Sequence, residues 1–180
     1  MEKIGVFCAS SNDLDPIYYE EGRRLGQWIG EHDLTLIYGG HNTGLMEAVA
    51  QGVKSTGKGI VVGVVPKILI DKGTVSECVG IRVPTEDLSD RKAWLMKLSD
   101  VMIAMPGSVG TLDEAFSVMS QNAIGISPKK IIFWNINGFW DGLFSMLEGL
   151  KKTGVVNKPL EEIMLRADTF EQLTELLKAF

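Results

Sequence analysis

The sequence has few residues of the kinds that build metal centres or disulfide frameworks. Its 180 residues include only two cysteines, Cys8 and Cys78, and two histidines, His32 and His41. The cysteines lack the spacing of a metal site or a disulfide, and two histidines are too few for a histidine-based metal site without carboxylates. These shortages exclude the common zinc-site and disulfide-rich classes. They also favour a reducing compartment, which we expect to be the cytoplasm.

The sequence also lacks an excess of positive charge and any long apolar run. Its formal net charge of −5 argues against non-specific binding of nucleic acid, because a phosphate backbone needs a basic face. No stretch is long and apolar enough to cross a bilayer, and no signal-peptide pattern precedes the first apolar run. We therefore expect a small-molecule ligand, and neither a nucleic acid nor a membrane, as the partner. The negative net charge is compatible with a small phosphorylated ligand held by one or two local cationic side chains.

The sequence does contain a regular alternation of short apolar runs and amphipathic stretches, which is typical of βαβ units. We predict strands at residues 4–8, 35–38, 59–65, 80–83, 101–104, 130–133 and 163–166. We predict helices at residues 16–31, 43–55, 87–98, 110–122, 139–151 and 169–178. The expected fold is one domain over residues 1–180, a doubly wound, Rossmann-like three-layer α/β/α sandwich. In such folds ligands bind at the carboxyl ends of the strands.

One predicted strand end carries the segment MPGSVGTLDE, residues 105–114. Gly107 and Gly110 permit a tight turn and a close approach of the backbone to a ligand. The first amides of a helix have no internal partners and carry partial positive charge, so this turn can bind an anion without a lysine. The residues of this segment that we expect to bind a ligand are Pro106, Gly107, Ser108, Val109, Gly110 and Thr111. The glycines by themselves are equally compatible with a simple strand-to-helix connection.

Two charged positions extend this pattern. Glu114 follows early in the same helix, where a carboxylate is able to activate water or stabilise positive charge, or serve only the helix dipole. Arg91 and Lys92 begin the preceding predicted helix, and an arginine can hold a phosphate or carboxylate through two parallel hydrogen bonds. In isolation such an Arg-Lys pair is typical of a solvated helix face. Trp134, Phe139 and Trp140 are expected in the core or at a subunit interface.

A second glycine-rich turn, residues 39–44, follows another predicted strand and lacks the Lys-Ser/Thr pair of a nucleotide triphosphatase loop. Gly39 and Gly40 are expected to line the same cleft. Ser10, at the small and hydroxyl-rich end of the first predicted strand, is expected there too.

In this order the motifs resemble the Lonely Guy phosphoribohydrolases, which often carry the label of lysine decarboxylases. That family has Pro-Gly-Gly-X-Gly-Thr-X-X-Glu, an upstream Arg-Lys pair and an upstream Gly-Gly-Gly-X-X-Gly-Leu-Met. The counterparts here are residues 106–114, residues 91–92 and residues 39–46. The opening VFCASS and the GVVP at residues 63–66 are also similar to the family. The resemblance extends from residue 4 to about residue 150.

The resemblance implies a homodimeric, Rossmann-like enzyme that hydrolyses the N-glycosidic bond of a nucleoside 5′-monophosphate, either AMP or an N6-isoprenoid AMP. The products are the free base and ribose 5-phosphate. Arg91 and Glu114 are then the catalytic pair, with Gly107 to Thr111 around the 5′-phosphate and Lys92 beside it. No metal or organic cofactor is implied. Pyridoxal-dependent decarboxylation has no supporting lysine motif in this chain.

Several positions depart from the family pattern. Ser108 replaces a glycine of the phosphate loop and would cost about 1 kcal/mol if its φ were positive. His41 replaces the third upstream glycine, Glu47 stands where many members have glycine, and Gly73 occupies a position where members often carry glutamate. An alternative is therefore a non-catalytic protein on the same fold that binds a nucleotide or carries the molybdenum cofactor.

Overall fold

The chain folds around a parallel β-sheet, described by a computed structural model for residues 1–127 and 129–180. In the described residues the sheet has seven strands in the order β4-β3-β2-β1-β5-β6-β7. The bounds are β1 (Lys3–Phe7), β2 (Thr35–Tyr38), β3 (Ile60–Pro66), β4 (Ile81–Thr85), β5 (Val101–Ala104), β6 (Ile131–Trp134) and β7 (Leu165–Ala167). Each neighbouring pair is parallel. The predicted doubly wound α/β fold is thereby confirmed.

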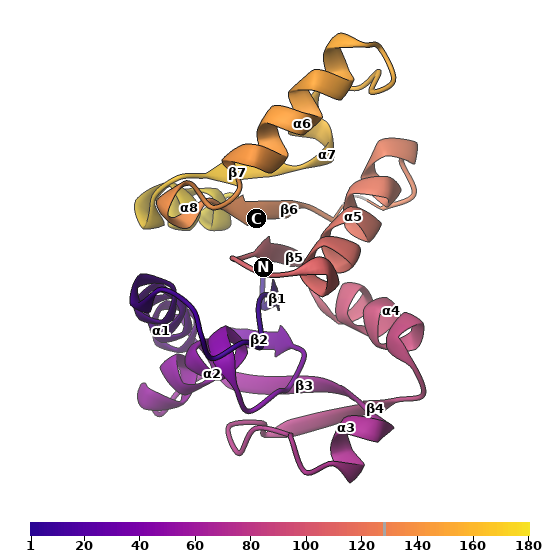
Figure 1. Ribbon diagram of the computed structural model, residues 1–180. Helices are drawn as coiled ribbons and strands as arrows, with labels where there is room; N and C mark the ends of the chain where they lie inside the picture. The colour runs from indigo at the N-terminus through magenta and orange to yellow at the C-terminus, as the bar shows by residue number, and fades with distance from the viewer. Residues whose placement is uncertain (128) are drawn as a thin grey trace.

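Helices cover both faces of the sheet, which makes three layers (Figure 1). One face packs against α1 (Pro16–Glu31), α2 (Gly44–Ser55) and α8 (Phe170–Lys178). The other packs against α4 (Leu88–Leu98), α5 (Val109–Ile124), α6 (Asp141–Lys152) and α7 (Leu160–Ile163). The short α3 (Lys67–Asp71) follows β3, and a 3₁₀ turn, Ile136–Gly138, follows β6. Each face of the sheet therefore buries its own apolar cluster.

Strand β1 lies at the centre of the sheet, between β2 and β5. Ile4 is in register with Leu36 on one side and with Val101 on the other. The chain order reverses on the two sides of β1, and this reversal opens a crevice at the carboxyl ends of β1, β2 and β5. The predicted ligand-binding segments follow these strands.

Local sequence explains the starts of α1 and α4. Asp15 accepts a hydrogen bond from the Ile17 amide at 3.1 Å and Pro16 occupies the first helical position, so α1 begins where the sequence predicts. Helix α4 is capped by Asp87, whose Oδ1 accepts from the Asp90 amide at 2.8 Å. The helix predicted at residues 87–98 therefore begins at Leu88, with residue 87 as its cap.

The main remaining differences from prediction concern short elements, and several other helix and strand ends move by one or two residues. The expected strand at residues 163–166 begins too early, since Ile163 ends α7 and β7 starts at Leu165. Helices α3 and α7 were not predicted, because four or five residues are too few to show helical periodicity. Helix α5 begins at Val109, one residue before the predicted start.

The aromatic residues near the end of β6 divide into two environments. Trp134 and Trp140 are 1% and 4% exposed and lie in the core, as expected. Phe139 is 40% exposed and meets the Tyr18 ring edge-on at 5.8 Å between ring centroids. In the described part of the chain, no helix combines the length and apolarity that a bilayer crossing requires.

Candidate active site

Backbone hydrogen bonds join three loops at the carboxyl edge of the sheet. The Ala9 amide donates to the Pro106 carbonyl at 3.0 Å, which ties the loop after β1 to the loop after β5. The Ala9 carbonyl accepts from the amides of Leu45 and Met46 at 3.0 and 3.3 Å, at the start of α2. The three predicted ligand-binding segments therefore form one fixed edge.

Gly44 allows the loop after β1 to lie directly against the start of α2. Its φ is +64°, and a Cβ there would collide with the backbone of Ser10 and Ser11. A side chain at residue 44 is therefore excluded by both conformation and space. The exposed Ser10 stays at the rim of the crevice as a result. Gly40 also has positive φ, +73°, and its carbonyl accepts from the Ser76 amide at 2.9 Å.

The first amides of α5 face the loop after β5 and form an anion cradle. Within the described residues, the N–H groups of Val109, Gly110 and Thr111 have no hydrogen-bond acceptor. Free amides and the positive end of a helix dipole together attract an anion such as a phosphate. A Cβ at Gly107 would collide with the Thr111 side chain, so glycine lets this loop close onto the helix start.

Ser108 precedes α5 in an extended conformation, with φ −97° and ψ −160°. The strain that a positive φ would impose on serine is therefore absent. The exposed Ser108 side chain makes no capping hydrogen bond, and its hydroxyl lines the space beside the cradle. Serine in place of glycine thus leaves the loop backbone undistorted.

A buried ion pair lies between α4 and α5. Arg91 Nη1 is 3.6 Å from Glu114 Oε1, and the two side chains are 13% and 11% exposed. Arg91 also donates from Nε to the Val64 carbonyl at 3.1 Å, at the end of β3. Among the described residues this is the only hydrogen bond of its guanidinium. The Nη hydrogens are therefore available to a ligand.

Burial raises the pKa of Glu114 to about 7, and the charges of Arg91 and Lys92 only partly oppose that rise. A carboxyl group with this pKa exchanges a proton near neutral pH, as an acid–base catalyst needs. The buried Cys8 thiol also has a raised pKa, chiefly from burial and then from the Glu114 charge. Cys8 is therefore a packed, free thiol.

Gly39 provides space for the arginine. A Cβ at this buried position would collide with Arg91 Nη2 and lie 3.0 Å from the Met46 sulfur. The end of β2 thus forms a wall against which the guanidinium lies.

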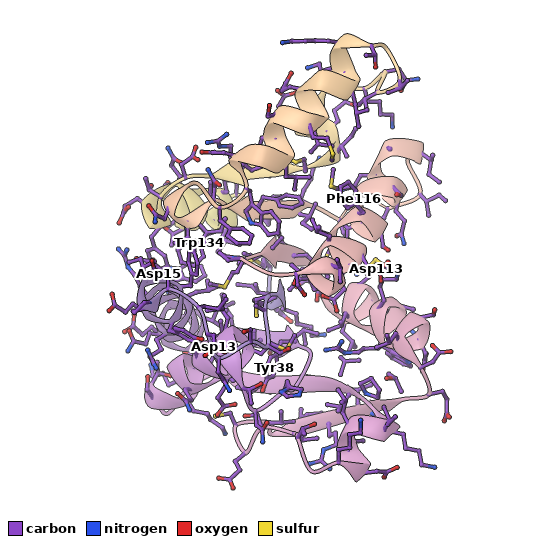
Figure 2. The ribbon with its side chains drawn as sticks, in the orientation of Figure 1. Asp13, Asp15, Tyr38, Asp113, Phe116 and Trp134 are labelled. Atoms are coloured by element: carbon purple, nitrogen blue, oxygen red, sulfur yellow. The ribbon has the colours of Figure 1, made fainter. Side chains whose placement is uncertain are left out.

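Lys92 pairs with a different carboxylate of α5 from Arg91. Its Nζ donates to both carboxylate oxygens of Asp113, at 2.8 and 2.9 Å. Asp113 lies on α5 near the start of the helix, one turn before Phe116 (Figure 2). The structure therefore places Lys92 in an interhelical salt bridge beside the cradle.

A cavity of about 330 Å³ adjoins the cradle. Its walls come from the loops after β1 and β5 and from Phe139, and its lining residues are Ala9, Ser10, Ser11, Leu14, Pro106, Gly107, Ser108 and Phe139. A larger cavity, of about 460 Å³, lies between α1 and α8 and is lined by Asp15, Glu21, Asp168 and Glu171 among others. Neither space is lined by Arg91 or Glu114, but the smaller one is lined by the predicted site residues Ser10, Gly107 and Ser108, whereas the larger one is lined by none of the predicted site residues. The described residues contain no cluster of three or more His, Cys, Asp or Glu suited to a metal ion.

Comparison with known proteins identifies the family. The family model described as "Possible lysine decarboxylase" matches residues 46–177. A cytokinin riboside 5′-monophosphate phosphoribohydrolase of Arabidopsis thaliana is 33% identical over 178 residues, which cover 99% of this chain and 82% of that protein. The chain belongs to the Lonely Guy family. Lonely Guy relatives are hydrolases by name, and the decarboxylase description is the label of the family model alone.

Solved structures share the Lonely Guy fold with this chain. A molybdenum cofactor binding protein from Rippkaea orientalis superposes with a TM-score of 0.73 at 24% identity, over 99% of this chain and 96% of that one. The molybdenum cofactor carrier protein of Chlamydomonas reinhardtii has a TM-score of 0.76 at 21% identity, with the same coverage. At these identities the likeness shows the fold alone.

Some site features were not predicted from the Lonely Guy motifs. The Val64 carbonyl that orients Arg91 belongs to the GVVP segment. That segment resembles the family, but the resemblance assigns no contact to its backbone. His41 Nδ1 lies 2.8 Å from Thr43 Oγ1, and that hydroxyl donates to the Ser10 carbonyl at 2.8 Å. Gly73 has φ +67°, a conformation that disfavours the glutamate which members often carry there.

Proposed function

We propose that the chain hydrolyses the N-glycosidic bond of a nucleoside 5′-monophosphate and releases the free base and ribose 5-phosphate. The observation that carries this proposal is the buried Arg91–Glu114 pair beside an amide cradle at a helix start. In a nucleotide the phosphate lies close to the glycosidic bond. In this fold the cradle that would bind the phosphate likewise lies close to the carboxylate that would act on that bond. Family membership supports the same reaction class.

In this proposal the phosphate binds the free amides at the start of α5, with Gly107 and Ser108 around it. The bond between C1′ and the base nitrogen breaks, and its electron pair goes to the base. Positive charge develops on the ribose, and the Glu114 carboxylate stabilises that charge. Glu114 removes a proton from the attacking water, whose oxygen bonds to C1′, and the departing base takes up a proton.

Arg91 serves as the cationic partner in this reaction. Its Nε is held by the Val64 carbonyl, so its Nη groups point in a fixed direction and can bind an oxygen of the ribose or phosphate. The same charge limits the rise in the pKa of Glu114, which keeps a useful fraction of that carboxyl ionised at neutral pH.

The finer substrate is proposed by analogy with the relatives. AMP is the simplest nucleotide that fits the proposal, and an N6-isoprenoid AMP would give a free cytokinin, in line with the name of the Arabidopsis relative. Ser10, Gly39, Gly40 and Lys92 would complete the surroundings of the substrate.

We further propose a homodimer in the cytoplasm, as the resemblance implies. Leu88 and Val109, at the starts of α4 and α5, are 68% and 81% exposed and so offer apolar surface beside the site. A molecular mass near twice 19.7 kDa in multi-angle light scattering would support a dimer. A single-chain mass would contradict it.

The decisive experiment measures adenine and ribose 5-phosphate released from AMP and from isopentenyl-AMP. We expect Glu114→Gln to lower the turnover number by about 10²- to 10⁴-fold. Asp113→Asn is the matched control, since Asp113 is adjacent, acidic and 65% exposed, and we expect it to stay within about twofold of the wild type. Bound AMP with no turnover in the wild type would instead favour the non-catalytic binding or carrier function.

A further inference from the structure

His41 stands beside the proposed site, at a position where the family pattern has glycine. Its backbone is held on both sides: the Asn42 amide donates to the Thr74 carbonyl at 3.0 Å, and the Ser76 amide donates to the Gly40 carbonyl at 2.9 Å. His41 itself forms an isolated β-bridge with Val75. The ring therefore projects from a fixed backbone.

Hydrogen-bond accounting determines the tautomer of this ring. The Ser10 carbonyl can only accept, so the single hydroxyl hydrogen of Thr43 is used in the 2.8 Å bond to Ser10. Thr43 Oγ1 can then only accept from His41 Nδ1, which lies 2.8 Å away. Nδ1 therefore carries a hydrogen, and in a neutral ring Nε2 is left as an acceptor.

The surroundings keep the ring neutral. Burial, and then the positive charge of Arg91, lower the pKa of His41 below its ordinary value. The side chain is nevertheless only partly buried. Among the described residues Nε2 has no hydrogen-bond partner. A neutral acceptor with no partner in the described residues is thus held within the electrostatic reach of Arg91.

Two links connect His41 to the proposed nucleotide site. Through Thr43 the ring is anchored to Ser10, which lines the cavity beside Gly107 and Ser108. The charge that acts on the ring belongs to Arg91, the partner of Glu114. The ribose must lie between the phosphate and the scissile bond, and it carries hydroxyl groups that can donate to an acceptor.

We propose that His41 is a specificity-determining residue that accepts a hydrogen bond from a ribose hydroxyl through Nε2. This assignment rests on the proposed function in taking a nucleoside 5′-monophosphate as the ligand. The His41 side chain would make the chain selective for ribonucleotides. The glycine at this position of the family pattern has no side chain that could make the same hydrogen bond.

The test compares AMP with 2′-deoxy-AMP and 3′-deoxy-AMP, each bound to protein carrying Glu114→Gln and followed by calorimetry. His41→Phe keeps a ring and removes the acceptor, whereas His41→Gln restores one. We expect His41→Phe to reduce the preference for AMP over one of the deoxynucleotides by about three- to tenfold. We expect His41→Gln to keep most of that preference. His32→Phe is the matched control, since His32 stacks on Trp28 at the end of α1.

Other outcomes overturn the assignment. Equal weakening of all three nucleotides by His41→Phe would make His41 a purely structural residue. A change confined to the preference for AMP over purine riboside 5′-monophosphate, which lacks the amino group, would move the contact to the base. No AMP binding at all would also refute it. Adenine release from AMP by protein with Glu114 intact tests the proposed function separately, so the two failures are distinguishable.

Discussion

Lys92 binds both carboxylate oxygens of Asp113, at 2.8 and 2.9 Å, and this salt bridge joins α4 to α5 one residue along from Arg91 and Glu114. Two successive residues of one helix thus pair with two successive residues of the other, in reverse order. The outer pair is partly exposed and the inner pair is buried. The inner carboxylate, Glu114, has a pKa raised to about 7, and the outer pair adds a salt bridge between the two helices.

The raised pKa of Glu114 predicts how stability depends on pH. Its pKa is about 7 in the folded chain against an ordinary value of 4.5, so between these pH values the folded state holds a proton that the unfolded state has lost. The contribution of Glu114 to stability therefore falls as pH rises from 4.5 to 7, by on the order of 3 kcal/mol. Glu114→Gln removes this dependence. In urea unfolding at pH 5 and 7.5, the free energy of unfolding of the variant relative to that of the wild type should be larger at the higher pH.

Groups that titrate in both proteins cancel in that comparison. Parallel pH dependences for the wild type and Glu114→Gln would show that the carboxyl has an ordinary pKa in the folded chain.

The same group predicts the pH dependence of turnover. If ionised Glu114 stabilises the sugar cation and accepts the proton of water, the turnover number should rise with pH and level off above an inflection near 7. At saturating AMP the turnover number reports the enzyme–substrate complex, so the ionisation of free AMP does not affect the profile. Asp113→Asn should keep an inflection but move it to a lower pH, because the charge of Asp113 is one of the causes that raise the pKa of Glu114. A flat profile between pH 5.5 and 8.5 would remove Glu114 from the proton transfer.

Gly39→Ala tests the placement of Arg91. The added Cβ collides with Arg91 Nη2, while the backbone at residue 39 has no positive φ and tolerates alanine. The guanidinium must shift, and kcat/KM for AMP should fall by about tenfold or more, since misplaced catalytic groups are costly. Gly149→Ala in α6 is the matched control, because its Cβ meets nothing within 4 Å. That control should gain about 0.5–1 kcal/mol in stability at unchanged activity; an active Gly39→Ala would show that Arg91 is freely adaptable.

Ser108→Gly tests whether the serine impairs the cradle. Because Ser108 has φ −97°, glycine relieves no strain there, and the variant should lose a few tenths of a kcal/mol at the start of α5. Adenine release should stay within about twofold, because the cradle amides are unchanged. A large gain in rate would mean that the hydroxyl obstructs the phosphate, and thermal unfolding would confirm that the fold is intact.

Sequence periodicity was sufficient for the elements with strong local signals. Asp15 and Pro16 mark the start of α1, and continuous apolar runs mark β2 and β5. Family motifs pointed to Arg91 and Glu114. Their 3.6 Å separation could not be predicted from spacing, because it depends on how α4 and α5 pack over the sheet.

The engagement of Lys92 by Asp113 escaped prediction for the same reason, and the His41–Thr43–Ser10 chain depends on Gly44 letting two loops touch. Contacts between segments distant in sequence are set by packing and by backbone geometry, which no local pattern records.

The central position of β1 has a consequence for the order in which the site is assembled. Its second neighbour, β5, begins at residue 101, and the carboxylate comes later still, at residue 114. Pairing across such a sequence separation is slow, because a long loop must close before any contact compensates for the lost entropy. A nascent chain shorter than this lacks half of the crevice, so ligand binding reports that β5 and the start of α5 have joined β1. A nucleotide that binds the finished crevice would accordingly act late, stabilising these contacts after they form without guiding the earlier steps.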